Sequence, residues 1–434
     1  MFNKIIEKRP YIGLFLFLLI SISNSYGNKA KGSLISIIEV KGNNKTLDYI
    51  LEREILHPIN NPLDSSLVIE DKNRLDNLGL FSESTWHVIP LENGTSKLVY
   101  FVKESINKTP PLILPTYKED VGWSLAGLWI INNFRGKNQS LTLGGSIGGE
   151  DTYGLSFTDP WIFGDHISLS LNVGRTLYGH RFLNKQLDVN SFYVNLGKWY
   201  GNSIKTSIGI ELETKFFYDD TYKDKFYYLG LIGDLRYDTR DIYWNPGRGV
   251  LFSQKIYHRE GIIPDNWGIM LWNQSFSWYK QINGKVKKSV IALNASFQNK
   301  IGNKSRLWLD YFGNGTTVRG WPLPYPDLYF SKKESFRFGH ESILFSAEIR
   351  QELIPKYATS YGFESGLAIV IFSDVGVISN NWVDLKNQMP MYGLGVGIRI
   401  PFPIVGVIRV DYGWGYSNQS WNSGAIHWGT GQKF

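Results

Sequence analysis

The residues MYGLGVGIRI (391–400) and VIRVDYGWGY (407–416) decide the fold class of this chain. In both runs every second residue is large and apolar, and the residues between them are mostly glycine or charged. Successive side chains of a β-strand point to opposite faces, so each run has one face suited to hydrocarbon and one suited to water. This alternation is typical of the strands of a transmembrane β-barrel. The apolar faces hold Tyr392, Leu394, Val396, Ile398 and Ile400 in the first run, and Ile408, Val410, Tyr412, Trp414 and Tyr416 in the second.

The composition of the 434 residues favours strands over helices as the membrane-crossing elements. Hydrophobic residues make up 43% of the chain, yet no stretch offers the roughly 20 consecutive apolar residues that a membrane-spanning helix needs. The aromatic content of 15% and the 44 glycines suit a barrel with aromatic girdles and a crowded interior. Insertion into a membrane must therefore come from strands.

Sixteen candidate strands follow one another after residue 111. An even number of strands returns both ends of the barrel to the same side of the membrane. We therefore predict an all-β transmembrane barrel of sixteen antiparallel strands over residues 106–434. The strand centres are Leu114, Leu125, Leu143, Leu155, Leu169, Tyr193, Ile210, Leu231, Phe252, Phe276, Leu293, Phe345, Ile369, Val396, Val410 and Trp428.

The N-terminus has the pattern of a secretory signal peptide. Three basic residues lie within the first nine positions, residues 11–22 are nearly all apolar, and Ser25 and Gly27 are small residues at cleavage spacing. We expect a signal peptide over residues 1–27; a short membrane anchor is the alternative. The chain contains no cysteine, which excludes lipoprotein processing, disulfides and thiolate metal sites.

Residues 33–105 predict a small α+β domain in the order β-α-α-β-β. A strand covers 34–40, a first helix begins near Thr46 as its N-cap and a second near Asp64, and two strands flank Asn93-Gly94, a strong hairpin signal. This order, with Gly42-Asn43 after the first strand and Gly79-Leu80-Phe81 after the second helix, resembles a POTRA domain. Its sheet edge could accept an extended strand of another chain, because unpaired backbone groups template pairing.

The barrel region resembles the BamA/TamA-type outer-membrane assembly superfamily. The similarity is carried by the phrases NNFRGKNQSLTLGGS, LSFTDPWIF and DTRDIYWNPGRG, which begin at residues 132, 155 and 238. The resemblance covers most of residues 33–434. It implies an outer-membrane location in a Gram-negative-type bacterium, with the POTRA domain in the periplasm.

A long loop over residues 301–339 shows little strand pattern, and connections of this length are usually functional. The loop contains Val318, Arg319, Gly320 and Trp321 in sequence. These residues resemble the V-R-G-F/Y motif of the superfamily's sixth extracellular loop, with Trp in place of Phe or Tyr. The resemblance implies that the loop folds back into the lumen, where its arginine meets acidic side chains on strands twelve and thirteen.

Alternation places two acidic residues on the lumen face without using this motif. The apolar residues of 343–349 and of 367–375 fall on the lipid face, so Glu348 and Asp374 point inward. A guanidinium between two carboxylates can bind both and relieve their repulsion. We therefore expect Arg319 to join Glu348 and Asp374, to pin the loop and to hold the closing strands in register. A charged surface loop with a chance Arg-Gly pair is the alternative.

The seam between the first and last strands is predicted to pair weakly. The first strand carries Pro115 and Tyr117; the last, 425–434, carries Gly429 and Gly431 and ends at Phe434. Proline cannot donate to a ladder, and glycine weakens a strand and permits bending. The superfamily resemblance implies that this seam is the lateral gate for client strands, with Gly431 at the bending position. All five residues are candidate gate residues.

Other function classes find little support. Residues 144–148 match G-x-S-x-G, but they lie within a predicted strand, whereas a nucleophile elbow needs a strand-to-helix turn. The seven histidines show no metal-ligand spacing. The net charge of +7 is not concentrated in a basic cluster with interleaved aromatic residues. We expect no enzymatic activity, cofactor, metal or nucleic-acid partner.

The sequence thus predicts an outer-membrane protein that inserts or translocates other proteins through a lateral seam. Its expected partners are unfolded outer-membrane or secreted client proteins, the lipid of the outer membrane, and periplasmic chaperones or accessory proteins. Two alternatives remain open. One is a passive pore or structural surface antigen on the same scaffold, and the other is a two-partner secretion pore, a group that normally carries two POTRA domains and a plug helix.

Overall fold

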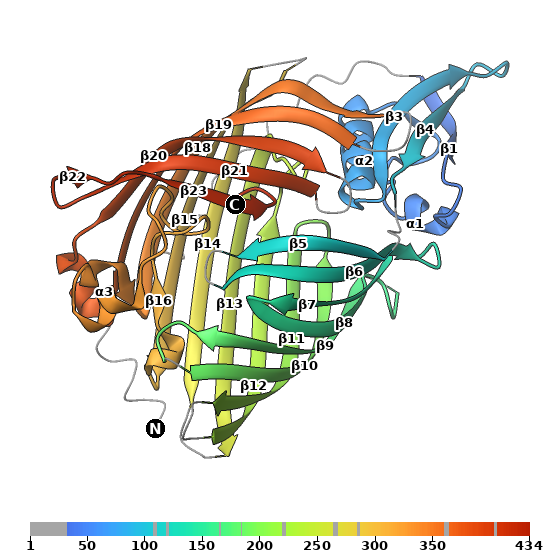
Figure 1. Cartoon of the computed structure of the whole chain (residues 1–434). Helices are drawn as coiled ribbons and strands as arrows, with labels where there is room; N and C mark the ends of the chain where they lie inside the picture. Colours follow the sequence, from blue (N-terminus) through green and yellow to red (C-terminus); the bar gives the residue numbers. More distant parts are fainter. Residues whose placement is uncertain are drawn as a thin grey trace, which may run out of the picture.

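The computed structural model contains a small α+β domain standing against one end of a β-barrel (Figure 1). The sequence positions of the expected signal peptide, 1–27, lie outside the described residues. The described residues are 33–106, 111–118, 121–164, 166–183, 185–218, 223–263, 268–283, 287–359, 364–402 and 406–434.

The N-terminal domain packs two helices on one face of a four-stranded sheet. The predicted order β-α-α-β-β is confirmed, with a two-residue strand added between the helices. Asp64 accepts hydrogen bonds from the backbone N–H groups of Ser66 and Leu67 and so begins the second helix as an N-cap. The sheet order is β2-β1-β4-β3, which leaves β3 at an edge. The elements are β1 (Leu34–Lys41), α1 (Asp48–Glu52), β2 (Asn61–Pro62), α2 (Ser65–Asn77), β3 (Phe81–Pro90) and β4 (Ser96–Glu104).

The barrel closes with sixteen strands that pair with their sequence neighbours, as predicted, and a two-residue strand, β22, beside them. Its first ten strands are β5 (Leu112–Lys118), β6 (Gly122–Phe134), β7 (Gln139–Gly148), β8 (Glu150–Asp159), β9 (Ile167–His180), β10 (Lys185–Tyr200), β11 (Ile204–Tyr218), β12 (Lys223–Asp238), β13 (Arg248–Ile263) and β14 (Ile269–Asn283). The others are β15 (Ser289–Gly302), β18 (Glu341–Ala358), β19 (Glu364–Ser379), β20 (Met391–Phe402), β21 (Gly406–Ser417), β22 (Ser420–Trp421) and β23 (Ala425–Thr430).

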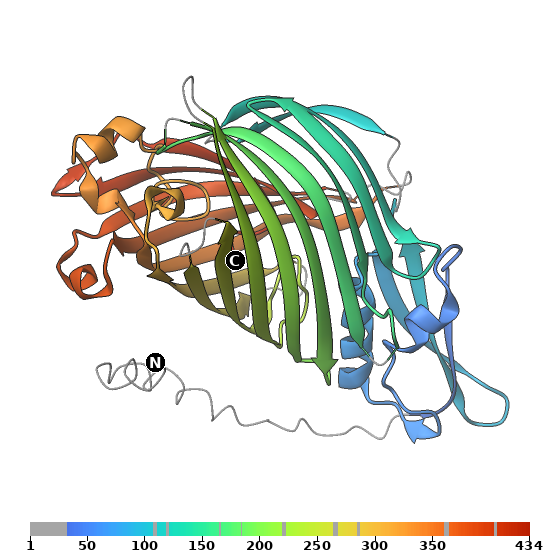
Figure 2. The ribbon, with the colours of Figure 1, turned by 90° about the horizontal axis from the view of Figure 1, so that it is seen from below.

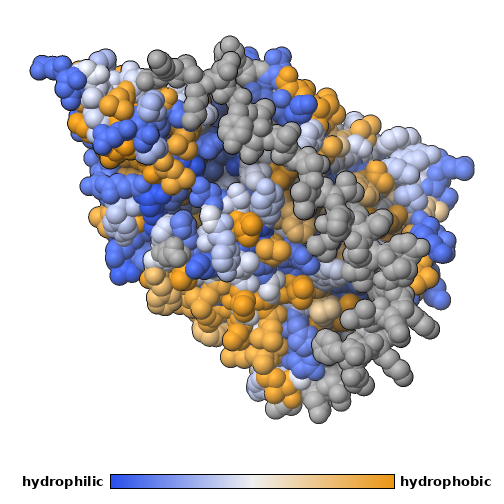
Figure 3. All heavy atoms as spheres, turned by 180° about the vertical axis from the view of Figure 1, so that it is seen from behind, coloured by the Kyte–Doolittle hydropathy of each residue, from blue (hydrophilic) through white to orange (hydrophobic). Residues whose placement is uncertain are grey.

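The outer wall of the barrel is apolar and the inner wall is polar. Along β20 buried and exposed residues alternate strictly, with Met391, three glycines, Arg399 and Pro401 inside and the other large apolar residues outside. Figure 3 shows hydrophobic residues gathered in a broad patch on the outer surface. This is the surface that a hydrocarbon environment requires. Among the described residues, no helix has the length and hydropathy needed to cross a membrane.

The N-terminal domain contacts several turns at one end of the barrel, which we call the near rim (Figure 2). These contacts are polar and come from both helical segments of the domain. They hold the domain against the end at which β5 begins and β23 ends. Hydrogen bonds join Thr46 to Asn133 (2.8 Å) and Asn77 to the backbone of Asp241 (3.0 Å), and Arg53 lies 4.2 Å from the ring centre of Trp161.

Candidate functional site

The long loop between β15 and β18, residues 303–340, crosses the interior of the barrel. Near its start Trp308 packs with Tyr228 of β12 and Ile269 of β14. Further along, Val318 packs with Leu344 of β18 and Ile378 of β19. The loop therefore touches two separate parts of the barrel wall, and it fills part of the lumen between them.

Arg319 is the polar anchor of this loop, and no part of its side chain is exposed. Its backbone N–H and Nε donate to Oδ2 of Asp374 (3.0 and 2.8 Å), and Nη2 donates to Oδ1 of the same carboxylate (3.1 Å). Nη1 donates to Glu348 (2.6 Å) and to Asp411 (3.2 Å). The guanidinium also lies 3.7 Å from the ring centre of Phe372. The structure thus brings Arg319, Glu348 and Asp374 together.

The residues after Arg319 tie the loop to the last strands. The N–H of Gly320 donates to Nε2 of His427 in β23 (2.9 Å). Gly320 has φ +84°, and a Cβ at this position would lie 2.6 Å from the backbone of Trp414, so only glycine fits here without strain. Trp321 donates from its indole to the carbonyl of Tyr392 (2.8 Å). The motif therefore contacts β20, β21 and β23 as well as the two acidic residues.

The glycines of the inner wall provide the space for this contact. A Cβ on Gly393 would lie 2.0 Å from the carbonyl oxygen of Arg319, and one on Gly415 would lie 2.4 Å from the ring of Trp321. A Cβ on Gly376 would meet Phe312 of the loop at 2.4 Å. The glycines that alternate with apolar residues thus form a shallow inner surface on which the loop lies.

The cluster is larger than the sequence predicted. Asp411 is a third carboxylate, shared by Arg319 (3.2 Å) and Arg399 (2.6 Å). Arg350 donates from Nε to Glu348 (2.8 Å), and Lys433 pairs with Asp374 (2.7 Å). The alternation that placed Glu348 and Asp374 inside also places Arg399 and Asp411 there. The approach of Lys433 could not be found in that way, because it depends on a bend in the chain.

The seam is formed by the two shortest of the sixteen strands. β5 has seven residues and β23 has six, whereas each of the other fourteen has at least ten. In β5, Pro115 lies opposite Leu125 and Tyr117 lies opposite Trp123 of β6. In β23, Gly429 lies opposite Arg409 of β21. Four of the five predicted gate residues thus lie in or directly beside these two strands, with Gly431 following β23.

Phe434 is a correction. The predicted last strand, 425–434, ends at Thr430, and Gly431 turns the chain with φ +74°. The final residues run into the barrel, where the C mark lies in both ribbon views (Figures 1 and 2). Phe434 packs with Tyr279, Val290 and Ala292 on the inner wall. It therefore lies away from the seam, because a left-handed glycine redirects the chain that alternation alone would continue as a strand.

A sixteen-stranded barrel with an apolar outer wall, an arginine-anchored loop in its lumen and a small α+β domain at one rim defines the class of loop-filled outer-membrane β-barrels with an N-terminal domain. The sequence matches the Omp85 superfamily domain over residues 133–434 and the surface antigen variable number repeat, or POTRA, over residues 34–105. The chain belongs to the Omp85 superfamily.

Individual relatives agree with this assignment. The outer membrane protein assembly factor BamA of Neisseria meningitidis serogroup B is 29% identical over 150 residues, which are 34% of this chain and 18% of that protein. The match thus spans less than a fifth of the relative's length. Among solved structures, BamA from Haemophilus ducreyi lacking POTRA domains 1–3 has a TM-score of 0.53 at 16% identity, covering 91% of this chain and 83% of that one. CdiB from Acinetobacter baumannii has a TM-score of 0.51 at 16% identity, covering 90% and 72%. These structural similarities concern the fold.

Proposed function

We propose that this protein inserts or translocates other proteins at the outer membrane through the seam between β5 and β23. The observation that carries the proposal is the shortness of these two strands within a barrel of much longer ones. A backbone group left unpaired in hydrocarbon costs several kcal/mol. An opened seam would offer its free backbone groups to a client strand, so the client would not meet lipid unpaired.

The N-terminal domain supplies a second place for an extended client. The edge strand β3 has ten residues and pairs with β4 on one side. An edge of this length can accept a further strand through backbone hydrogen bonds. In the proposed orientation this domain faces the periplasm, where unfolded clients and their chaperones or accessory proteins would reach it, and the apolar outer wall faces the lipid of the outer membrane.

The lumen contents count against a passive pore. The long loop packs on β12 and β14 at one place and on β18 and β19 at another, and its arginine is fully buried. A wide aqueous channel would need this loop to leave. The two-partner secretion pore is the second candidate, because the fold alone does not separate it from an insertase: the CdiB structure from Acinetobacter baumannii has a TM-score of 0.51 to the chain and the BamA structure has 0.53.

A disulfide across the seam tests the proposal, since the natural chain has no cysteine. Sixteen strands of alternating direction make β5 and β23 antiparallel, so Ile113 lies toward the same rim as Thr430, and Tyr117 toward the same rim as Ile426. Purified protein carrying either cysteine pair would be placed in liposomes, and the folding rate of an unfolded outer-membrane client would be measured. The matched control is a pair at Leu394 and Trp414, which lie opposite each other in β20 and β21.

Locking the seam should abolish the acceleration of client folding, and a reductant should restore it, while the control disulfide should have no effect. Unchanged acceleration with a closed lock would reject the seam mechanism. Ion conductance that persists when the disulfide closes the seam would favour the passive pore. Export of a polypeptide through a locked barrel would favour the secretion pore.

A further inference from the structure

The arginine cluster of the lumen contains more positive than negative charge. Among the described residues it comprises five cationic and three anionic side chains, and each side chain is at most 4% exposed. Charges buried in this way are costly unless they are paired. The cations are Arg319, Arg350, Arg399, Arg409 and Lys433, and the anions are Glu348, Asp374 and Asp411.

Two of these arginines keep N–H groups without a protein acceptor. Nη1 of Arg350 and both Nε and Nη1 of Arg409 are buried and form no hydrogen bond. The nearest carboxylate oxygen to Arg409 is on Asp411, 3.7 Å from Nε, and that carboxylate already accepts from Arg319 and Arg399. Buried donors of this kind normally have a partner. The surplus charge and the unfilled donors both indicate a missing acceptor that is negatively charged.

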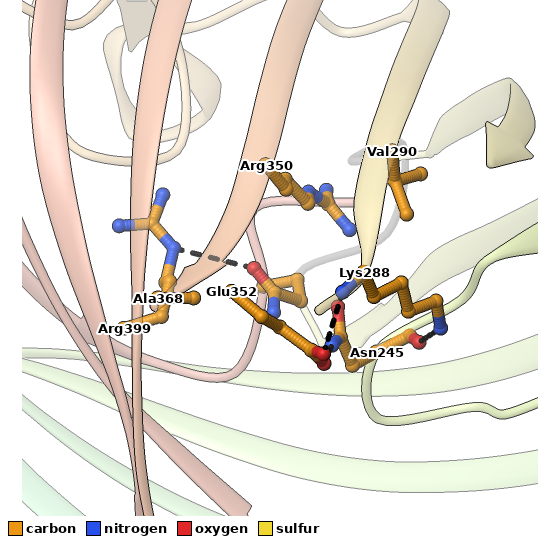
Figure 4. Close-up of a pocket in the computed structure, with 8 residues that line it drawn as sticks. Asn245, Lys288, Val290, Arg350, Glu352, Ala368 and Arg399 are labelled. Carbon is orange, nitrogen blue, oxygen red and sulfur yellow. Dashed lines mark hydrogen bonds between the residues drawn. The ribbon is translucent and has the colours of Figure 1, made fainter. Parts of the chain in front are cut away.

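A small polar pocket lies beside Arg350; Arg409 is not among its lining residues, so Nη1 of Arg350 is the unfilled donor that this pocket concerns. Arg350 extends from β18 toward Val290 of β15 and toward Lys288, which directly precedes that strand (Figure 4). Arg399 contributes a third cation to the lining, and Glu352 is the carboxylate among the lining residues. Nε of Arg350 donates to Glu348 and its Nη2 to the backbone oxygen of Phe434, so Nη1 is the donor left for a ligand. The free space holds about one water-sized group.

We propose that this pocket binds a small inorganic anion of the size of chloride, held by Arg350 with Lys288 and Arg399 around it. A monatomic anion accepts hydrogen bonds from several directions, and of the inorganic anions it requires the smallest enlargement of a space that fits one water-sized group. A water molecule could accept the bond from Nη1, but it would leave one positive charge in surplus even when the carboxylate of the last residue, Phe434, which accepts from Nη2 of Arg350, is counted. Larger anions such as gluconate or phosphate do not fit the space.

The test uses the full-length protein in detergent micelles. Its melting temperature would be compared in sodium gluconate, chloride and bromide at equal ionic strength, because screening is then the same in all three. Chloride and bromide should raise the melting temperature in a saturable way, since a ligand that binds the folded state stabilises it. Crystals grown with bromide should show an anomalous peak within hydrogen-bonding distance of Nη1 of Arg350.

Variants separate this site from general salt effects. Arg350→Gln should weaken the halide response at least tenfold in apparent affinity. Arg175→Gln, which breaks an ion pair with Asp188 on the outer face of the barrel, should leave the response unchanged. If Arg350→Gln does not fold, the halide titration and the bromide peak of the natural protein decide the question. Equal melting in all three salts, or an absent peak, would overturn the proposal.

Discussion

Replacing Arg319 by alanine is the sharpest perturbation of the lumen cluster. The side chain forms four hydrogen bonds to three carboxylates and is completely buried. Removing one partner of a buried ion pair typically costs about 3–5 kcal/mol. Here each carboxylate keeps another cation: Arg350 at Glu348, Lys433 at Asp374 and Arg399 at Asp411. We therefore expect Arg319→Ala to lower the free energy of unfolding by about 3 kcal/mol, the lower end of this range, with most of the effect in the loop.

The loop should respond more strongly than the barrel wall. The strands keep their ladders, whereas the loop loses the polar anchor between Val318 and Gly320. Arg319→Ala should thus insert into the membrane, expose the loop to proteolysis around residues 313–321 and slow client folding in liposomes. Arg319→Lys keeps the charge but not the fork that binds two carboxylates, so its effects should lie between those of alanine and the natural residue.

Limited proteolysis followed by mass spectrometry locates the loop cleavage, and the liposome assay measures activity on the same preparations. Arg175→Gln is the control, because it removes an arginine and its ion pair on the outer face of the barrel, away from the loop. A variant Arg319→Ala whose loop resists protease as well as the natural protein, and which folds clients at the same rate, would refute the anchoring role.

Three further outcomes follow from individual contacts. Gly320→Ala forces a Cβ against the backbone of Trp414 at positive φ. The substitution should lower the free energy of unfolding of the loop by about 1–3 kcal/mol and increase its proteolysis. A protease pattern like that of the natural protein would contradict this. Lys433→Met removes the bonds from Nζ to Asp374 and to the carbonyl of Thr317. Hydrogen exchange in the loop should become faster, but less so than in Arg319→Ala. Equally fast exchange in the two variants would contradict the view that Arg319 is the stronger anchor. Tyr100 donates to the buried carboxylate of Asp71 (2.8 Å), and burial, reinforced by that carboxylate, raises the pKa of Tyr100. The folded domain thus favours the neutral phenol, so its free energy of unfolding should be highest below about pH 10, the ordinary pKa of tyrosine, and should fall as the pH rises further. In urea unfolding, Tyr100→Phe should not show this fall, and at pH 7 its free energy of unfolding should be lower by about 1.5–3 kcal/mol.

Strand alternation was sufficient to predict the barrel. The sixteen strand centres all fall within sixteen observed strands because a wall between lipid and water imposes a period of two on every crossing. The same rule located Glu348 and Asp374, which depend on strand phase alone. Local signals predicted the start of α2 at Asp64 but misplaced the cap of α1. Thr46 instead bonds Glu104 and Asn133, and Leu47 takes the capping position.

Strand alternation could not predict the contacts made by segments that lie outside the barrel wall. The inward turn at Gly431 depends on one residue with positive φ, and glycine permits that conformation without requiring it. Once the chain turns, Lys433 reaches Asp374 and Phe434 reaches Tyr279, although neither contact has a periodic signature. The docking of the N-terminal domain on the near rim is likewise set by single polar contacts between separate turns.

His427 connects the loop motif to the seam and gives the last prediction. This residue of β23 is buried, and its Nε2 accepts the hydrogen bond from the N–H of Gly320. Together with the ladder to β21, this bond holds β23 from inside, whereas β5 pairs along its length with β6. When the seam opens, we therefore expect β23 to stay attached to the loop and β5 to move away from it. His427→Ala leaves a buried N–H unpaired, a loss of about 1–3 kcal/mol, and should speed hydrogen exchange in β23 and in residues 318–321 together.

The variant His427→Gln is the control, because a glutamine oxygen can accept the same bond. It should restore slow exchange at least in part. Faster exchange in β23 without a change in the loop would show that the two are not connected through this bond. Equal behaviour of the alanine and glutamine variants would show that the imidazole contributes by packing and not by accepting from Gly320. If the bond holds β23 from within the lumen, His427→Ala should speed exchange in both the loop and β23, and His427→Gln should slow it again in both.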